Sequence, residues 1–113
     1  MLHVLSMTQI TPQLLQQWLT DRERKPPVLL DVREPWEHRT CRIEGSVLAP
    51  MNTIPARAHE FDPASDTVVI CHHGVRSYQV GLFLERQGFS RLYNLQGGVN
   101  AWATQVEPTM PRY

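Results

Sequence analysis

The chain has 113 residues, of which 42% are hydrophobic and 19% charged, a composition typical of a globular protein with one core. Lysine and arginine together number 11, as do aspartate and glutamate, so the formal net charge is zero. A balanced charge provides no general attraction to nucleic acid or to an anionic membrane, and we expect neither as a partner.

Helices and strands are expected to alternate along the chain. Thr11 followed by Pro12 is typical of a helix start, and the apolar spacing predicts a helix to about residue 20. Residues 28–32 form an apolar run that meets a carboxylate, as expected of a buried parallel strand whose end faces a site. The other expected strands cover residues 46–49, 67–70 and 92–95, and the other expected helices cover 34–39, 55–61, 77–88 and a short segment around 101–102.

This alternation implies an α/β fold with a central, mostly parallel β-sheet flanked by helices. We expect one domain over residues 1–113, with a core over about 10–104 and an irregular C-terminal tail over 105–113. Residues 1–7 lack the charged and apolar regions of a secretory signal, and no apolar run is long enough for a membrane span. A cytoplasmic location, where a free thiol survives, is therefore expected.

Cys71 is the strongest candidate for a functional residue. It follows the β-branched run of residues 68–70 and precedes a compact loop and a helix. Unpaired backbone N–H groups and the positive end of a helix dipole meet at such a position and favour the thiolate, the reactive form of cysteine. Asp31 ends another predicted strand. Because ligands bind outside the carboxyl ends of parallel strands, we expect Asp31 and Cys71 to face one crevice.

Three segments of the chain resemble the motifs of a rhodanese domain. Residues 30–38 and 43–46 resemble its first half, and residues 95–102 resemble its closing motif. The active-site loop is matched by Cys71-His72-His73-Gly74-Val75-Arg76-Ser77. The similarity runs from about residue 10 to residue 102, with the motifs in the same order as in the family. The chain is similar to the single-domain, stand-alone type of rhodanese.

The resemblance implies a sulfurtransferase that works through a persulfide on Cys71. The cysteine would attack the outer sulfur of thiosulfate or a similar small donor, and sulfite would leave. Cyanide, a small thiol or a protein thiol would then accept the sulfur, which is covalent catalysis in two steps. No cofactor is implied. A metal site is not expected either, because three adjacent ligands at Cys71, His72 and His73 cannot easily converge on one ion.

The other loop residues are expected to shape the sulfur site. His72 and His73 are interpreted as loop side chains that lend N–H groups and mild positive potential, because a thiolate needs no strong base. Gly74 is expected to supply a positive φ or room above the sulfur. Arg76 either binds the sulfite portion of the donor or closes the loop through a salt bridge, and both roles can hold together. Val75 and Ser77 complete the predicted loop.

Two further sets of residues lie outside the loop. Asp31, Arg33 and Glu37 are expected to form a supporting charge network beneath it, as the resemblance implies. Cys41 could resolve the persulfide or form a disulfide with Cys71, although an ordinary semi-buried cysteine is the simpler interpretation. The tail has no expected role beyond packing or partner contact.

Two alternative functions are weighed against the free enzyme. One is a sulfur-relay or binding module that takes persulfide from a protein partner, which an intact cysteine loop does not exclude. The other is a phosphatase or arsenate reductase. Those enzymes use a C-x5-R loop to surround a tetrahedral oxyanion, whereas Cys71 and Arg76 define the shorter pattern C-x4-R, which suits a single sulfur atom.

Overall fold

The computed structural model describes residues 7–113. The sequence-based prediction that residues 1–7 are not a secretory signal therefore falls almost entirely outside the described residues. Five strands form one sheet in the order β1-β5-β4-β2-β3, and each neighbouring pair is parallel. The predicted α/β fold with a parallel sheet is thereby confirmed. The strands are β1 (Met7–Ile10), β2 (Val28–Asp31), β3 (Val47–Leu48), β4 (Thr67–Ile70) and β5 (Leu92–Leu95).

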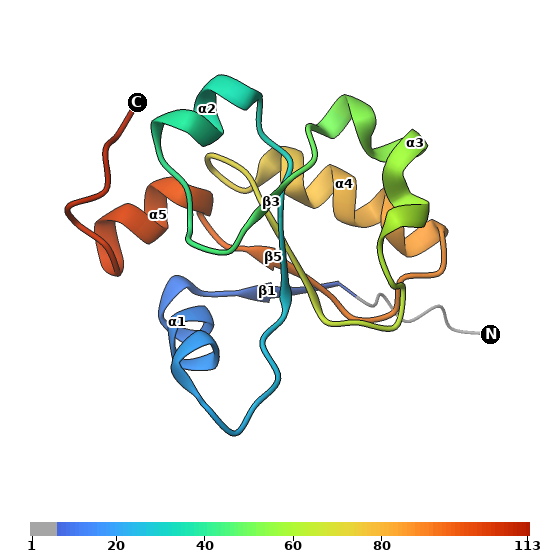
Figure 1. Ribbon diagram of the computed structural model, residues 1–113, viewed down its shortest axis with the longest axis horizontal. Coiled ribbons are helices and arrows are strands. Elements are labelled where there is room, and N and C mark those ends of the chain that lie inside the picture. The colour runs from blue at the N-terminus through green and yellow to red at the C-terminus, as the bar shows by residue number, and fades with distance from the viewer. Residues whose placement is uncertain (1–6) are drawn as a thin grey trace.

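Helices cover both faces of the sheet (Figure 1). The helix α1 contacts α5 on one side, and α4 contacts β4, β5 and β1 from the other. The helices are α1 (Pro12–Thr20), α2 (Pro35–Thr40), α3 (Ile54–Arg57), α4 (Val75–Arg86) and α5 (Gly98–Gln105), with 3-10 turns η1 (Met51–Thr53) and η2 (Ala58–Glu60) on either side of α3. Within residues 7–113, no helix has the length and apolarity needed to cross a membrane.

The central strand β4 divides the core into two apolar clusters. Its side chains alternate between the faces of the sheet, as in any strand. Val68 and Ile70 belong to the cluster that contains Trp18 and Trp102. Val69 and Cys71 belong to the opposite cluster, with α4 residues Val80 and Leu84. The sulfur of Cys71 is therefore carried on the α4 side of the sheet.

Several predicted boundaries are wrong for local reasons. The edge strand β1 has two exposed polar residues, which gave no strand signal in the sequence. The helix α4 begins at Val75, two residues before the predicted Ser77, because Gly74 serves as its N-cap with φ 103°. The single helix predicted over 55–61 is the four-residue α3 followed by η2, and α5 is longer than the short helix predicted around residues 101–102.

Candidate active site

Cys71 directly follows the central strand, in a loop that ends at the N-terminus of α4. Its side chain is buried, with 1% of the residue exposed. The sulfur accepts a hydrogen bond from the Gly74 N–H at 3.0 Å and lies 3.2 Å from the Ser77 hydroxyl. The positive φ of Gly74 permits this tight return of the backbone over the sulfur. The loop thus encloses one sulfur atom beside a helix start.

The carbonyl oxygens of the loop are held by α5. The Val99 N–H donates to the Cys71 carbonyl at 2.8 Å, and the Asn100 N–H donates to the His72 carbonyl at 3.0 Å. Gly98 makes this approach possible, since a Cβ at Gly98 would lie 2.4 Å from each of the two oxygens. Because these two carbonyls bond to α5, their oxygens are directed to α5 and not to the thiol, while the Gly74 N–H faces the sulfur.

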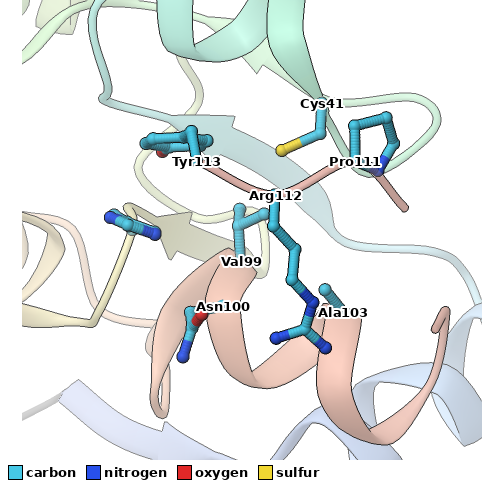
Figure 2. A pocket seen from close by; sticks show the side chains of 8 residues that line it. Cys41, Val99, Asn100, Ala103, Pro111, Arg112 and Tyr113 are labelled. Carbon is cyan, nitrogen blue, oxygen red and sulfur yellow. The ribbon is translucent and has the colours of Figure 1, made fainter. Parts of the chain in front are cut away.

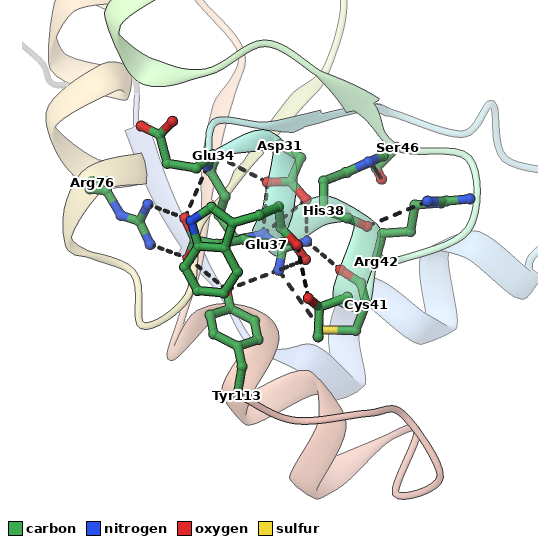
Figure 3. Close-up of polar contacts among 12 residues, drawn as sticks. Asp31, Glu34, Glu37, His38, Cys41, Arg42, Ser46, Arg76 and Tyr113 are labelled. Carbon is green, nitrogen blue, oxygen red and sulfur yellow. Dashed lines mark hydrogen bonds and ion pairs between the residues drawn. The ribbon is translucent and has the colours of Figure 1, made fainter.

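Arg76 forms an ion pair with Glu37 of α2. Its two terminal nitrogens donate to the two carboxylate oxygens at 2.7 and 2.8 Å, a bidentate pair (Figure 3). Glu37 also accepts from the Glu34 N–H at 2.9 Å. The hydrogen bonds from Arg76 are the largest cause that lowers the pKa of Glu37 to about 2. Of the two roles predicted for Arg76, the structure contains the loop-closing salt bridge.

A second ion pair lies deeper, between Arg33 and Asp31. The Arg33 side chain is fully buried, and its Nη2 lies 2.6 Å from Asp31 and 2.7 Å from the Cys41 carbonyl. The Asp31 carboxylate therefore lies under Arg33, and its described hydrogen bonds reach Arg33 rather than Cys71. The expectation that Asp31 faces the same crevice as the sulfur is wrong, because the buried guanidinium needs that carboxylate as its counter-ion.

Tyr113 joins the two ion pairs. Arg33 donates to its hydroxyl at 3.0 Å, and the hydroxyl donates to Glu37 at 2.8 Å. Burial is the main cause that raises the pKa of Tyr113 to about 12, so the phenol stays protonated. Asp31, Arg33 and Glu37, the residues of the predicted charge network, therefore lie in two ion pairs: Asp31 with Arg33, and Glu37 with Arg76. Tyr113 of the C-terminal tail connects the two pairs.

The ring of Tyr113 also supports the cysteine loop. It stacks on His72 with centroids 4.2 Å apart, and the half-exposed Trp36 meets its edge at 5.2 Å. The His73 ring is also close to that of His72, at 4.0 Å between centroids. Burial and the neighbouring His73 lower the pKa of His72, which favours a neutral imidazole. Over residues 7–113, no three histidine, cysteine, aspartate or glutamate side chains gather as metal ligands.

Cys41 lines a small pocket beneath the tail, to which His72 of the cysteine loop also contributes. Figure 2 shows its sulfur and Tyr113 on one side, and Val99, Asn100 and Ala103 of α5 on the other. Both cysteines are free and buried. Cys41 belongs to the apolar cluster opposite that of Cys71. The structure therefore favours the interpretation of Cys41 as a buried core cysteine over a partner for the Cys71 sulfur.

Two residues near the site were not predicted from the sequence. Asn94 is 3% exposed in β5, and its side chain contacts Ser77 and Gly74. A polar residue in an apolar strand beside β4 was a usable signal, because buried amides need specific partners. Tyr113 gave no signal, since it comes from the irregular tail and reaches Arg33 across 80 positions of sequence.

The ion pair of Glu37 predicts a dependence of stability on acid. The pKa of this carboxyl falls from its ordinary 4.5 to about 2 on folding. A depressed pKa contributes stability above the unfolded value, and this contribution is lost as the pH falls from 4.5 towards 2. We expect the free energy of unfolding of the wild type to fall over this range. The difference in free energy of unfolding between the wild type and Glu37→Gln should narrow accordingly. Denaturant titrations at several pH values measure both, and a gap independent of pH would contradict the prediction.

These features define an α/β domain that presents one buried cysteine in a tight loop at the end of its central parallel strand. Residues 11–105 match the family described as the rhodanese-like domain. The chain belongs to this family.

Known relatives agree in fold and in kind of activity. The chain is 38% identical over 102 residues to a sulfurtransferase of Allochromatium vinosum, covering 90% of this chain and 94% of that protein. It is 30% identical to the thiosulfate sulfurtransferase GlpE of Glaesserella parasuis, covering 91% and 93%. The crystal structure of a rhodanese-like domain protein from Staphylococcus aureus superimposes with a TM-score of 0.78 at 35% identity, covering 85% and 91%. The relatives support a sulfurtransferase role of the rhodanese type.

Proposed function

We propose that the protein moves a sulfane sulfur from thiosulfate, or a similar small donor, to a thiophilic acceptor through a persulfide on Cys71. The observation that carries the proposal is the buried Cys71 sulfur, held by the Gly74 N–H at 3.0 Å in a C-x4-R loop at the start of α4. Such a site stabilises negative charge on one sulfur atom, and its loop is one residue shorter than the C-x5-R loop that surrounds a tetrahedral oxyanion.

The first step is attack of the Cys71 thiolate on the outer sulfur of thiosulfate. A bond forms between the cysteine sulfur and that outer sulfur, and the S–S bond of thiosulfate breaks. Sulfite leaves with the electron pair of the broken bond, and the negative charge of the thiolate moves to the terminal sulfur of the persulfide. The loop N–H groups and the helix N-terminus are suited to hold that anion.

The second step transfers the terminal sulfur to the acceptor. Cyanide attacks this sulfur and leaves as thiocyanate, while the electron pair of the persulfide bond returns to Cys71 as thiolate. A small thiol or a protein thiol would react at the same sulfur. Because no proton needs to be removed from a deprotonated acceptor, neither His72 nor His73 is required as a general base.

Arg76 is proposed to close the loop rather than to react. Its two terminal nitrogens are occupied by Glu37, and the pair ties the first turn of α4 to α2. The guanidinium keeps its charge near the sulfur, because the hydrogen bonds that Arg76 donates to Glu37 raise the pKa of Arg76 further. It would thereby fix the loop and contribute positive potential to the thiolate.

Intact-protein mass spectrometry tests the proposal. Wild-type protein treated with thiosulfate and freed of the donor is expected to gain the mass of one sulfur atom, and cyanide is expected to remove it. Cys71→Ser should show no gain, and Cys41→Ser should behave as the wild type. A gain that persists in Cys71→Ser would contradict the assignment of the carrier.

The same experiment separates the free enzyme from a sulfur relay. A relay module would stay unloaded with thiosulfate at any accessible concentration and would gain sulfur from a persulfidated protein donor. Loading by thiosulfate, followed by thiocyanate formation over many turnovers, supports the enzyme. Loading by the protein donor alone would replace the proposed enzyme by a relay.

A further inference from the structure

We infer that Asn94 is a positioning residue that, through Ser77, holds the resting Cys71 sulfur in its protonated form. The inference concerns a chain of three buried side chains: Cys71 is 1% exposed, Ser77 0% and Asn94 3%. The sulfur lies 3.2 Å from the Ser77 hydroxyl oxygen, and the hydroxyl donates a short hydrogen bond to Asn94 Oδ1. Asn94 belongs to β5, the strand next to β4 in the sheet.

The orientation of the Asn94 amide follows from its other contacts. Its Nδ2 lies 3.1 Å from the Gly74 carbonyl and 3.2 Å from Gln9 Oε1. A backbone carbonyl only accepts hydrogen bonds, so the amide nitrogen, and not the oxygen, must face Gly74. The Asn94 oxygen consequently faces Ser77.

The direction of the Ser77 hydrogen bond follows in turn. An amide oxygen only accepts, so the hydroxyl must donate its single proton to Asn94. The Ser77 oxygen then presents its lone pairs to Cys71. A thiol can donate its proton to those lone pairs, whereas a thiolate would face them without a donor.

Two opposing influences therefore meet at the sulfur. The Gly74 N–H and the start of α4 favour the thiolate, while the Ser77 lone pairs oriented by Asn94 favour a sulfur without charge. If the proposed function is right, the inner sulfur of the Cys71 persulfide also carries no charge, because the negative charge lies on the terminal sulfur. Asn94 would thus favour the protonated and the sulfur-loaded states of Cys71 over the free thiolate.

The pH dependence of thiol alkylation tests this role without any sulfur donor. Cys41→Ser provides a background in which Cys71 is the only thiol, and the rate of reaction with iodoacetamide is measured against pH. In Asn94→Leu the Ser77 hydroxyl is released and can donate to the sulfur. We expect the midpoint to move to lower pH, with the rate below the wild-type midpoint rising about threefold to tenfold. An unchanged midpoint, or a shift to higher pH, would overturn the inference.

Ser77→Ala supplies the matched control. The effect of Asn94→Leu is expected to disappear in this background, because no hydroxyl remains to be reoriented, and an equal shift in both backgrounds would overturn the inference. If Asn94→Leu does not fold, Ser77→Ala alone decides: a midpoint that does not rise supports the lone-pair orientation, and a rise shows that the serine donates to the thiolate. Because alkylation needs no sulfur transfer, failure of this inference is distinguishable from failure of persulfide loading.

Discussion

Replacement of Cys71 by serine is expected to reduce sulfur transfer from thiosulfate to cyanide to the uncatalysed rate. The change removes the Cys71 sulfur at the end of β4 and replaces it by a hydroxyl, which stays protonated at neutral pH and is a weak nucleophile. The surrounding contacts are largely preserved, because an oxygen can still accept from Gly74, whose N–H lies 3.0 Å from the sulfur in the wild type. Thiocyanate formation measures the loss, and thermal unfolding measures whether the fold is retained.

Cys41→Ser is the matched control for this substitution. Cys41 is buried and free like Cys71, but it lies in the other apolar cluster. Its replacement is expected to lower stability modestly and to leave turnover within about twofold of the wild type, since its side chain and the reacting sulfur belong to different apolar clusters. Turnover retained in Cys71→Ser, or lost in Cys41→Ser, would move the nucleophile away from Cys71.

Asp31→Ala is expected to have the largest effect on stability, a loss of about 3–5 kcal/mol in the free energy of unfolding. The Arg33 side chain is fully buried, and Asp31 is its direct counter-ion at 2.6 Å. Without the carboxylate, the guanidinium would be left as a buried charge whose remaining partners are two carbonyls, the Cys41 sulfur and the Tyr113 hydroxyl. Urea denaturation followed by fluorescence measures the change.

A surface ion pair provides the comparison for Asp31→Ala. Arg57 and Glu60 form a pair at 3.1 Å, with 31% and 44% of their side chains exposed. Glu60→Ala is therefore expected to cost less than about 1 kcal/mol. Similar losses in the two variants would show that the buried Asp31–Arg33 pair contributes no more than a solvated one, contrary to the role inferred from its burial.

The sequence was most informative where structure depends on neighbouring residues. A β-branched run, a cysteine, a glycine and an amphipathic helix follow one another between residues 67 and 86, and this order predicted β4, the loop and α4 to within two residues. Gly74 follows Cys71 by only three residues, so the tight turn of the backbone over the sulfur could also be predicted from the sequence. The rhodanese-like motifs then placed this unit in its fold.

Side-chain partners far apart in the sequence were less accessible. Arg76 and Glu37 are 39 positions apart, and their pairing depends on how the fold brings the first turn of α4 to α2. The two roles of Arg76 therefore stayed open until the fold was known. The strand position of Asp31 wrongly suggested a side chain that faces the sulfur, whereas its association with Arg33 was expected only from the resemblance to the rhodanese motifs. The strand β1 is recognisable chiefly through its pairing with β5.

The separation of the two cysteines by the sheet has a consequence for oxidative damage. The chain contains only Cys41 and Cys71, and they belong to opposite apolar clusters. If peroxide converted Cys71 to a sulfenic acid, the described fold would offer it no second thiol with which to condense. Its rescue would depend on a thiol from outside the chain, and without one the sulfur would be open to irreversible oxidation to the sulfinic acid.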